Sequence, residues 1–347
     1  MNQSARSSNL FNVAVVGAAA LKGKEVRDVL SERSFPTINI KLLDEEEVLG
    51  QLEQVNDEPA LIQGVLPEHL EGVDFSFLTA DESYIAQTWA TVRDSGSEII
   101  DLSYALENNT DIIFRSPWVE CELGHTHEVA LQSAPVIVAH PAAVVLALLL
   151  ARLQKAAPVH LASAIICQPA SEYGRRGMDE LHDQTVNLLS FQQMPTAIFG
   201  AQVAFNLFAQ PIEGAHPSLR EIESRIMRHF KSISRDELPT PNVLLVQAPV
   251  FHGYTIAMYV QTEKALTASE LETALAGPHM TVTKSADEFP SNVNIAGSSE
   301  ILASVRPDAA GNGFWLWAAC DNLRISAIQA VECAEEMVQT RPRGKLQ

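Results

Sequence analysis

The chain has 347 residues, enough for two domains with separate cores, and its 46% hydrophobic and 19% charged residues are a globular composition. Its formal net charge is −19, from 24 basic and 43 acidic residues. This excludes nucleic acid and anionic membranes as main partners, because both require a basic surface. The four cysteines form no C-x-x-C pair, so neither a disulfide framework nor a metal site is predicted.

The polar N-terminus does not resemble a signal peptide, because it has one arginine and no apolar segment. The most apolar window, 136–150, is interrupted by His140 and Pro141 and is too short to span a bilayer. A cytoplasmic protein is therefore expected. His125 and His127 form an H-x-H pair without an evident third ligand, which favours an ordinary loop pair over a metal site.

A dinucleotide-binding fingerprint opens the predicted structure. The apolar run 13–16 meets Gly17, and Gly23 stands in the first turn of a helical pattern, as in the strand, tight turn and helix of a βαβ unit. Ala20 replaces the middle glycine, and its Cβ occupies space that a pyrophosphate would approach. Asp44 follows the second strand, where a carboxylate contacts the ribose of NAD. The predicted cofactor-binding residues are Gly17, Ala18, Ala19, Ala20, Leu21, Gly23 and Asp44.

Short β-like runs alternate with helical patterns up to about residue 133, and this order predicts a doubly wound parallel sheet of Rossmann type. The predicted strands are 13–16, 38–43, 75–78, 99–102 and 136–139. The predicted helices are 24–30, 83–95 and, after Pro141, 142–153.

After residue 157 the strands are longer and the order of elements is mixed, which predicts a second, α+β domain with a largely antiparallel sheet. The predicted strands are 159–166, 243–250, 254–262, 301–305 and 315–320. The predicted helices are 172–190, 218–229 and 323–340. The last helix is amphipathic, and its place in the chain allows it to return to the first domain.

The order of motifs resembles the aspartate-semialdehyde dehydrogenase family over nearly the whole chain. VAVVGAAALKGKEV is similar to the N-terminal VAVVGATGAVGxE of these enzymes, and IVAHPAAVV is similar to IANPNCST, the loop that carries their nucleophile. Further matches follow in the same order: IIDLSYAL, ICQPASEYGRRGMDEL, VAFNLFAQ, VQAPVFHGYT and WAACDNLRISA. Because VQAPVF has Gln where the enzymes have Arg, the chain most resembles the Usg group of dehydrogenase-like proteins.

The resemblance implies a chemistry in which a Cys attacks the aldehyde, the thiohemiacetal gives a hydride to NADP, and phosphate releases the acyl thioester. Here the nucleophile position is Ala143, which has no nucleophilic atom. The general-base position is Tyr254, a phenol with a pKa near ~10 and therefore a poor base. Gln168 keeps the active-site glutamine, whereas Gln247 and Glu107 replace two arginines that would hold carboxylate and phosphate.

His252 lies two residues before Tyr254 and on a strand would share its face, which makes it a candidate substitute base. An ordinary strand histidine is the favoured interpretation of this residue.

The cofactor side departs from the family in its charge. The segment 44–47 reads DEEE where the enzymes carry an arginine for the 2′-phosphate of NADP, so NAD or a smaller adenosine ligand is expected and NADP is not. Asp81 and Glu82 replace two glycines near the pyrophosphate and add negative charge. Asn322, in the CDNLR motif, completes the cofactor-binding residues that the resemblance implies.

The resemblance also implies a dinucleotide-binding domain over 1–140 and 321–347, a dimerisation domain of catalytic type over 141–320, and a homodimer. The leading hypothesis is a catalytically degenerate homologue that binds a ligand or a protein partner, because nucleophile, base and both arginines are lost together. The alternative is an active NAD-linked oxidoreductase that acts on an aldehyde or oxo group with a rebuilt site, using His252 or Tyr254. A third hypothesis is a structural partner of a true dehydrogenase.

Overall fold

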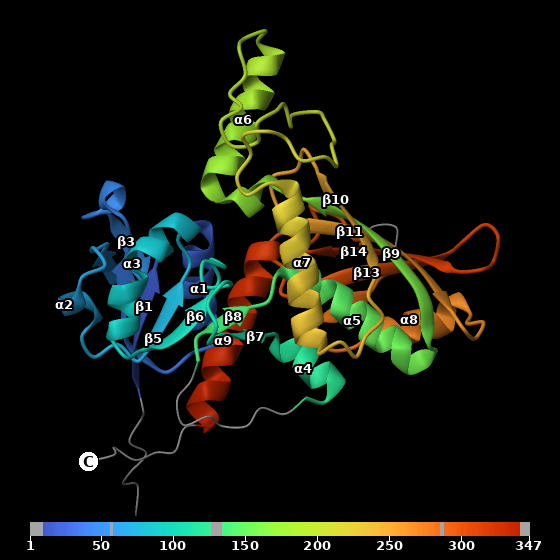
Figure 1. The fold of residues 1–347 in the computed structure, drawn as a ribbon, viewed down its shortest axis with the longest axis horizontal. Helices are drawn as coiled ribbons and strands as arrows, with labels where there is room; N and C mark the ends of the chain where they lie inside the picture. Colours follow the sequence, from blue (N-terminus) through green and yellow to red (C-terminus); the bar gives the residue numbers. More distant parts are fainter. Residues whose placement is uncertain (1–9, 56–57, 126–133, 285–287, 341–347) are drawn as a thin grey trace, which may run out of the picture. The chain divides into compact units, whose positions relative to one another are not determined.

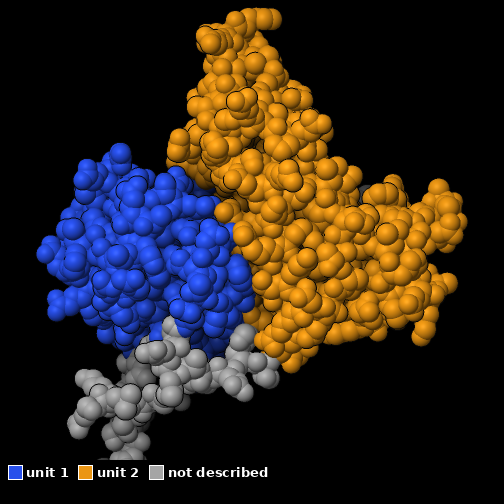
Figure 2. Space-filling view, viewed as in Figure 1, with its two compact units in different colours: residues 1–115, 127–138, 327–347 blue, residues 116–126, 139–326 orange. Residues whose placement is uncertain are grey.

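The computed structural model describes residues 10–55, 58–125, 134–284 and 288–340 (Figure 1). The chain forms two compact units, drawn in different colours in Figure 2. Unit 1 comprises 1–115, 127–138 and 327–347, and unit 2 comprises 116–126 and 139–326. None of the helices within the described ranges is long and apolar enough to cross a membrane.

Unit 1 is built on a six-stranded sheet with the order β2-β1-β5-β6-β8-β7, and all its neighbouring strands are parallel. The strands are β1 (Phe11–Val16), β2 (Thr37–Leu43), β5 (Phe75–Leu78), β6 (Glu98–Asp101), β7 (Ile113–Arg115) and β8 (Val136–Val138). The helices are α1 (Leu21–Glu32), α2 (Pro67–Leu70), α3 (Glu82–Asp94) and the 3₁₀ turn η1 (Glu46–Val48). The predicted parallel sheet of Rossmann type is thereby confirmed.

The strands at the centre of this sheet are apolar because both of their faces are covered. Val13, Val15, Phe75 and Phe77 are fully buried, and so are the residues that alternate with the two valines, Ala14 and Val16. The exposed hairpin formed by β3 (Leu52–Val55) and β4 (Glu58–Leu61) was not predicted, because its sequences LEQV and EPAL have neither an apolar run nor a clear alternation.

Unit 2 is built on a second six-stranded sheet with the order β10-β9-β11-β14-β13-β12. Its four central strands are antiparallel and its two edge pairs are parallel, as expected for a largely antiparallel α+β domain. The strands are β9 (Val159–Gln168), β10 (Asn242–Gln247), β11 (Tyr254–Thr262), β12 (Met280–Val282), β13 (Ile301–Pro307) and β14 (Phe314–Cys320).

Helices pack on one face of this sheet, as Figure 1 shows for α5, α7 and α8. The helices of unit 2 are α4 (Pro117–Leu123), α5 (Pro141–Ala156), α6 (Gly174–Leu189), α7 (Leu219–Ser234) and α8 (Ala268–Leu275). Helix α5 is apolar all round and buried over most of its length, which is typical of a helix inside a core. Helix α9 (Asn322–Thr340) begins in unit 2 and belongs to unit 1 from Ala327 onward.

Two predicted elements have different bounds. Strand β10 ends at Gln247 rather than at residue 250, because Pro249 follows closely and has no N–H for a ladder. The predicted helix 172–190 begins only at Gly174, whose φ of +65° separates α6 from a 3₁₀ turn, η2 (Ala170–Tyr173). The short elements α4, α8, β7 and β12 were not predicted, because three to eight residues carry too little periodicity.

Candidate functional site

The position that the resemblance assigns to the nucleophile, Ala143, lies in the first turn of α5. Ala143 is fully buried there, and its neighbours Ala142 and Val144 are buried as well. His140 caps the helix, because its Nδ1 accepts a hydrogen bond from the Ala142 N–H at 3.2 Å. The Nδ1 that accepts this bond leaves the proton of a neutral imidazole on Nε2. Helix α5 therefore presents a methyl group and a capping histidine at the position that the resemblance assigns to the nucleophile.

Tyr254 closes a buried polar cluster with His140 and Glu172. The Tyr254 hydroxyl donates to Glu172 Oε2 at 3.0 Å and lies 3.4 Å from His140 Nε2. The His140 Nε2 is also 3.2 Å from Glu172 Oε1. The backbone N–H of His140 donates a hydrogen bond to His229 Nδ1 at 2.9 Å. We call His140, Glu172 and Tyr254 the buried triangle. All three side chains are at most 6% exposed, so their polar atoms satisfy one another rather than a solvent-facing substrate.

The two glutamines of the site form a pair. Gln168 Nε2 donates to Gln247 Oε1 at 3.1 Å, and Gln247 Nε2 donates to the backbone carbonyls of Gln168 and Ala248. Gln168 Oε1 is buried and makes no hydrogen bond of normal geometry with the described residues. Gln247 thus links the end of strand β10 to the end of strand β9. Its side-chain amide is neutral and offers no positive charge to a substrate.

The prediction that His252 shares the face of Tyr254 is wrong, because β11 begins only at Tyr254. Gly253 adopts a φ of +81°, which breaks the alternation before the strand. The His252 ring turns to Asp321, with Nε2 2.8 Å from Oδ2, and its Nδ1 lies 3.3 Å from the Ser171 hydroxyl. The His252 side chain is 25% exposed, so solvent reaches it, whereas His140 and His229 are fully buried.

Asp321 is the hub of this second cluster. Its Oδ1 accepts hydrogen bonds from the N–H groups of Leu323 and Arg324 at the start of α9, and its Oδ2 accepts one from Gly297 N–H. Burial opposes ionisation of Asp321, but His252 and these N–H groups outweigh it and hold the pKa of Asp321 below its usual range. Asp321 is therefore a carboxylate that ties three segments together.

Asn322, a predicted cofactor residue, is buried beside Ser171 and Gly253. Its Oδ1 accepts hydrogen bonds from the Ser171 hydroxyl at 3.2 Å and from Gly253 N–H at 3.1 Å. Sequence reasoning did not identify Ser171, Asp321 or His140 as members of polar clusters. Two signals were available in the sequence: His140 precedes Pro141, which begins a helix, and Asp321 directly precedes the last helix.

None of the cysteines near the strand ends has the properties of a substitute nucleophile. Cys320 is the register partner of Tyr254, and burial together with the neighbouring Asp321 raises its pKa. Burial also raises the pKa of Cys167, against a hydrogen bond from Thr255. Both thiols therefore stay protonated near neutral pH, whereas catalytic cysteines need a lowered pKa.

The cofactor loop in unit 1 has the close packing of a dinucleotide-binding turn. A Cβ on Gly17 would lie 2.2 Å from the Ala80 backbone nitrogen, and one on Gly23 would lie 2.1 Å from the Gly17 carbonyl oxygen. Helix α1 has no side-chain cap and no acidic residue in its first turn, so its first N–H groups suit a phosphate. The loop residues fit a dinucleotide at the helix end, although Ala20 adds a methyl group there.

The loop amides and Asp44 are already paired. Gly17 and Ala18 donate to the Leu43 carbonyl, and Ala19 donates to Asp44 Oδ2 at 2.7 Å. The other oxygen of Asp44 accepts from the Glu45 N–H at 2.9 Å. Asp44 is buried, so any bond to a ribose hydroxyl would have to share these oxygens.

Negative charge surrounds the loop. Burial raises the pKa of Asp44, and the charge of Asp81 adds to this shift against the Ala19 and Glu45 N–H groups. Burial, together with the charges of Asp44, Glu45 and Glu46, raises the pKa of Tyr84 to about 12. These carboxylates and the Tyr84 phenol therefore influence one another's ionisation near the loop.

Glu107 and the H-x-H pair are the remaining predicted positions. Glu107 is half-buried at the end of a loop that Asp101 organises by accepting bonds from the N–H groups of Ser103, Tyr104 and Leu106. His125 pairs with Glu237 at 3.2 Å, whereas His127 lies outside the described residues. Across the described parts of the chain, no three His, Cys, Asp or Glu side chains are grouped as metal ligands.

Comparisons with known proteins match this architecture. Residues 12–139 match the model "Semialdehyde dehydrogenase, NAD binding domain", and residues 150–325 match "Semialdehyde dehydrogenase, dimerisation domain". The chain is 28% identical to an aspartate-semialdehyde dehydrogenase of Rickettsia bellii, covering 95% of this chain and 98% of that one. It is also 28% identical to a USG-1 protein homolog of Pseudomonas aeruginosa, covering 96% and 99%.

Solved structures agree with the sequence comparisons. A probable aspartate-semialdehyde dehydrogenase from Pseudomonas aeruginosa superimposes with a TM-score of 0.83 at 26% identity and covers 96% of this chain and 99% of its own. The aspartate semialdehyde dehydrogenase II of Vibrio cholerae, complexed with ASA, gives a TM-score of 0.82 at 25% identity and covers 96% and 100%. The domain models, the relatives and the two sheets agree, and the chain belongs to the semialdehyde dehydrogenase family.

Proposed function

We propose that this protein is a semialdehyde dehydrogenase homologue that no longer carries out the thioester chemistry and instead binds a ligand or a protein partner. The observation that carries the proposal is the buried triangle beside Ala143. A methyl group stands at the nucleophile position, and the groups at the base position hydrogen-bond one another in the interior. A nucleophilic aldehyde oxidation requires an ionisable nucleophile and a base that reaches it.

The lost cations support the same proposal. Gln247 is engaged with Gln168 and two backbone carbonyls, and Glu107 adds a negative charge where an arginine is expected. Carboxylate and phosphate are recognised by paired N–H groups on a fixed positive charge, which neither residue provides. A substrate with an acidic group and inorganic phosphate would therefore bind poorly here.

The experiment that tests the proposal is a steady-state assay with aspartate semialdehyde, phosphate and either NADP or NAD. The purified protein is expected to give no turnover above a mock preparation from the same host. Turnover that co-purifies with the protein and requires phosphate would overturn the proposal.

For the cofactor we propose NAD, or a smaller adenosine ligand, in preference to NADP. The support is the concentration of carboxylates near the loop, from Asp44, Glu45, Glu46 and Asp81, which would repel a 2′-phosphate. Fluorescence titration is expected to give saturable binding of NADH and at least about tenfold weaker binding of NADPH, a difference of about 1.4 kcal/mol. Equal affinity for both would contradict this preference.

We propose that the chain forms a homodimer through the sheet face of unit 2 that lies opposite α5, α7 and α8. Leu244, Ile165, Ala257 and Trp317 follow one another as register partners across four strands and therefore share one face. Ile165, Leu244, Trp315 and Trp317 are partly exposed there. An apolar row of this kind on a domain of the dimerisation family suits a second copy of the chain.

A second candidate function rests on His252. Its side chain is partly exposed and is oriented by Asp321, which is the arrangement of a histidine that moves protons. This pair favours an active NAD-linked oxidoreductase that acts on an aldehyde or oxo group without a thioester. Absence of saturable binding at millimolar NADH would eliminate this second candidate. Saturable binding is expected of both candidates, and the formation of NADH from NAD and an aldehyde without phosphate then separates them.

A further inference from the structure

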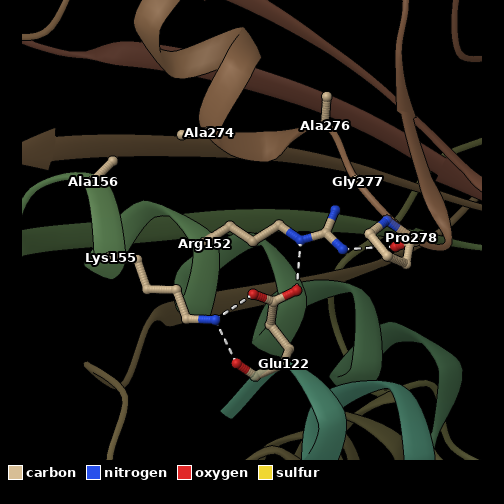
Figure 3. Close-up of a pocket in the computed structure, with 8 residues that line it drawn as sticks. All are labelled: Glu122, Arg152, Lys155, Ala156, Ala274, Ala276, Gly277 and Pro278. Atoms are coloured by element: carbon tan, nitrogen blue, oxygen red, sulfur yellow. Dashed lines mark hydrogen bonds and ion pairs between the residues drawn. The ribbon is translucent and has the colours of Figure 1, made fainter. Parts of the chain in front are cut away.

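A pocket opens at the far end of α5 from Ala143. It has a volume of about 370 Å³ and lies between α4, the last turn of α5 and the end of α8 (Figure 3). Ala143 and Lys155 are about 18 Å apart along the helix axis. The pocket lies within unit 2 and contains none of the residues discussed above. The residues that line it are Glu122, Arg152, Lys155, Ala156, Ala274, Ala276, Gly277 and Pro278.

Arg152 is the buried charge of this pocket. Its side chain is only 5% exposed and makes three hydrogen bonds, from Nε to Glu122 Oε2 at 2.9 Å and from the two Nη atoms to the carbonyls of Leu275 and Pro278 at 2.6 Å. A guanidinium has five N–H groups. Two of them, one on each Nη, therefore have no acceptor among the described residues.

The lining carries a net positive charge. Lys155 Nζ lies 2.6 Å from Glu122 Oε1 and also donates to the Glu122 carbonyl, as Figure 3 shows. Burial opposes ionisation of Glu122, but Lys155 and Arg152 outweigh it and lower its pKa. Two cations thus face one carboxylate, in a chain whose overall charge is −19. The Lys155 side chain is 58% exposed and can turn toward a bound anion.

Gly277 lies against one face of the Arg152 guanidinium. A Cβ at this position would lie 3.3 Å from Cζ and 3.4 Å from each Nη, directly over the planar group. The other walls are small and apolar, namely Ala156, Ala274, Ala276 and Pro278. Small side chains give the pocket its room, and they offer contacts to a short hydrocarbon body rather than to a fully hydrated ion.

We propose that this pocket binds a small organic carboxylate. The carboxylate accepts the two remaining N–H groups of Arg152 and the Lys155 ammonium, and its short aliphatic body packs on the alanine walls. Inorganic phosphate shares the acceptor chemistry but lacks the apolar body, so the geometry ranks it below a carboxylate. A neutral molecule of the same shape provides no negative charge to Arg152 and Lys155, so we expect that it does not bind in this pocket.

Ligand-observed saturation-transfer NMR tests the proposal on the full chain with butyrate and n-butanol as direct probes and with inorganic phosphate, which has no observable proton, as a competitor of butyrate. Butyrate is expected to saturate, n-butanol is expected to give no saturable signal, and phosphate is expected to displace butyrate only with an affinity at least about tenfold weaker than that of butyrate. Equal signals from butyrate and butanol would overturn the proposal. Phosphate that binds as tightly as butyrate would overturn the assignment to a carboxylate.

Two variants place the binding in this pocket. Gly277→Ala presses a Cβ against the Arg152 guanidinium and displaces it without altering charge, and Lys155→Met removes the exposed cation. Each is expected to weaken butyrate binding at least about tenfold. Gly64→Ala is the matched control, because a Cβ there has only one neighbour, at 4.0 Å, and should leave binding unchanged. Circular dichroism confirms the fold of each variant. If either folded pocket variant binds butyrate like the wild type, the proposed site is wrong.

Discussion

At the scale of single residues, the polar side chains of the candidate site differ in whether solvent can reach them. Tyr254, His140 and Glu172 satisfy one another in the interior, whereas His252 keeps a quarter of its side chain exposed. The assignments of Ala143 and Tyr254 to the nucleophile and base positions were available as predictions from the family motifs. Their hydrogen-bond partners were not, because Glu172 and His140 are 32 residues apart and meet only in the folded chain.

The Tyr254 hydroxyl is expected to stabilise the fold. Tyr254→Phe removes the donor to Glu172 inside the protein, and an unsatisfied buried group costs about 1–3 kcal/mol in the free energy of unfolding. Urea denaturation measures this loss. Tyr259→Phe is the control on the same strand, since its hydroxyl bonds to Asp308 at the surface and its loss should be smaller. An equal effect of both variants would contradict the role of the buried triangle.

Asp321 is expected to make stability depend on acid pH. Because its folded-state pKa is lowered below the ordinary value of 3.8, the ionised group stabilises the fold fully above that pH. The contribution disappears as the pH falls through the lower, folded-state value. Asp321→Asn should therefore cost about 1–3 kcal/mol near neutral pH, and the difference from wild type should shrink in acid. A difference that stays constant through this range would show that the charge of Asp321 does not matter.

At the scale of elements, hydrophobic periodicity predicted most of the two sheets. The strand 254–262 was predicted with its observed bounds, and the long helices were found within a few residues. The misses are short or exposed elements, such as the β3–β4 hairpin and α4, whose formation depends on neighbours rather than on local pattern. The His252 prediction failed for a related reason, since a single positive φ at Gly253 ends the period-two pattern.

The turn between β1 and α1 is expected to depend on Gly23. A Cβ there meets the Gly17 carbonyl oxygen at 2.1 Å, so Gly23→Ala must displace backbone. Overpacking of this kind costs about 1–3 kcal/mol, and NADH binding should weaken in parallel. Thermal denaturation and the NADH titration measure the two effects, with Gly64→Ala as the control. Unchanged stability in Gly23→Ala would mean that the turn is less tightly packed than described.

At the scale of the whole molecule, a Rossmann-type unit and an α+β unit retain the family architecture, and our proposal is that the site on them has lost two cations. The expected homodimer is tested by Ile165→Glu, which places a charge in the apolar row of unit 2. Sedimentation should show a dimer for the wild type and a monomer for this variant. Ile38→Glu changes an exposed isoleucine of unit 1 and should remain dimeric. A dimeric Ile165→Glu protein would exclude this face as the interface.

The central claim is the loss of aldehyde oxidation, and a single-turnover experiment tests it most directly. The protein is mixed with NAD or NADP, phosphate and less than one equivalent of aspartate semialdehyde, and the reduced cofactor is followed by its absorbance. Gly23→Ala, with its disturbed cofactor turn, serves as the control for contaminating host enzyme. The account predicts no reduced cofactor beyond that of the control with either cofactor. A burst approaching one equivalent of NADH or NADPH per aldehyde, absent from Gly23→Ala, would contradict it.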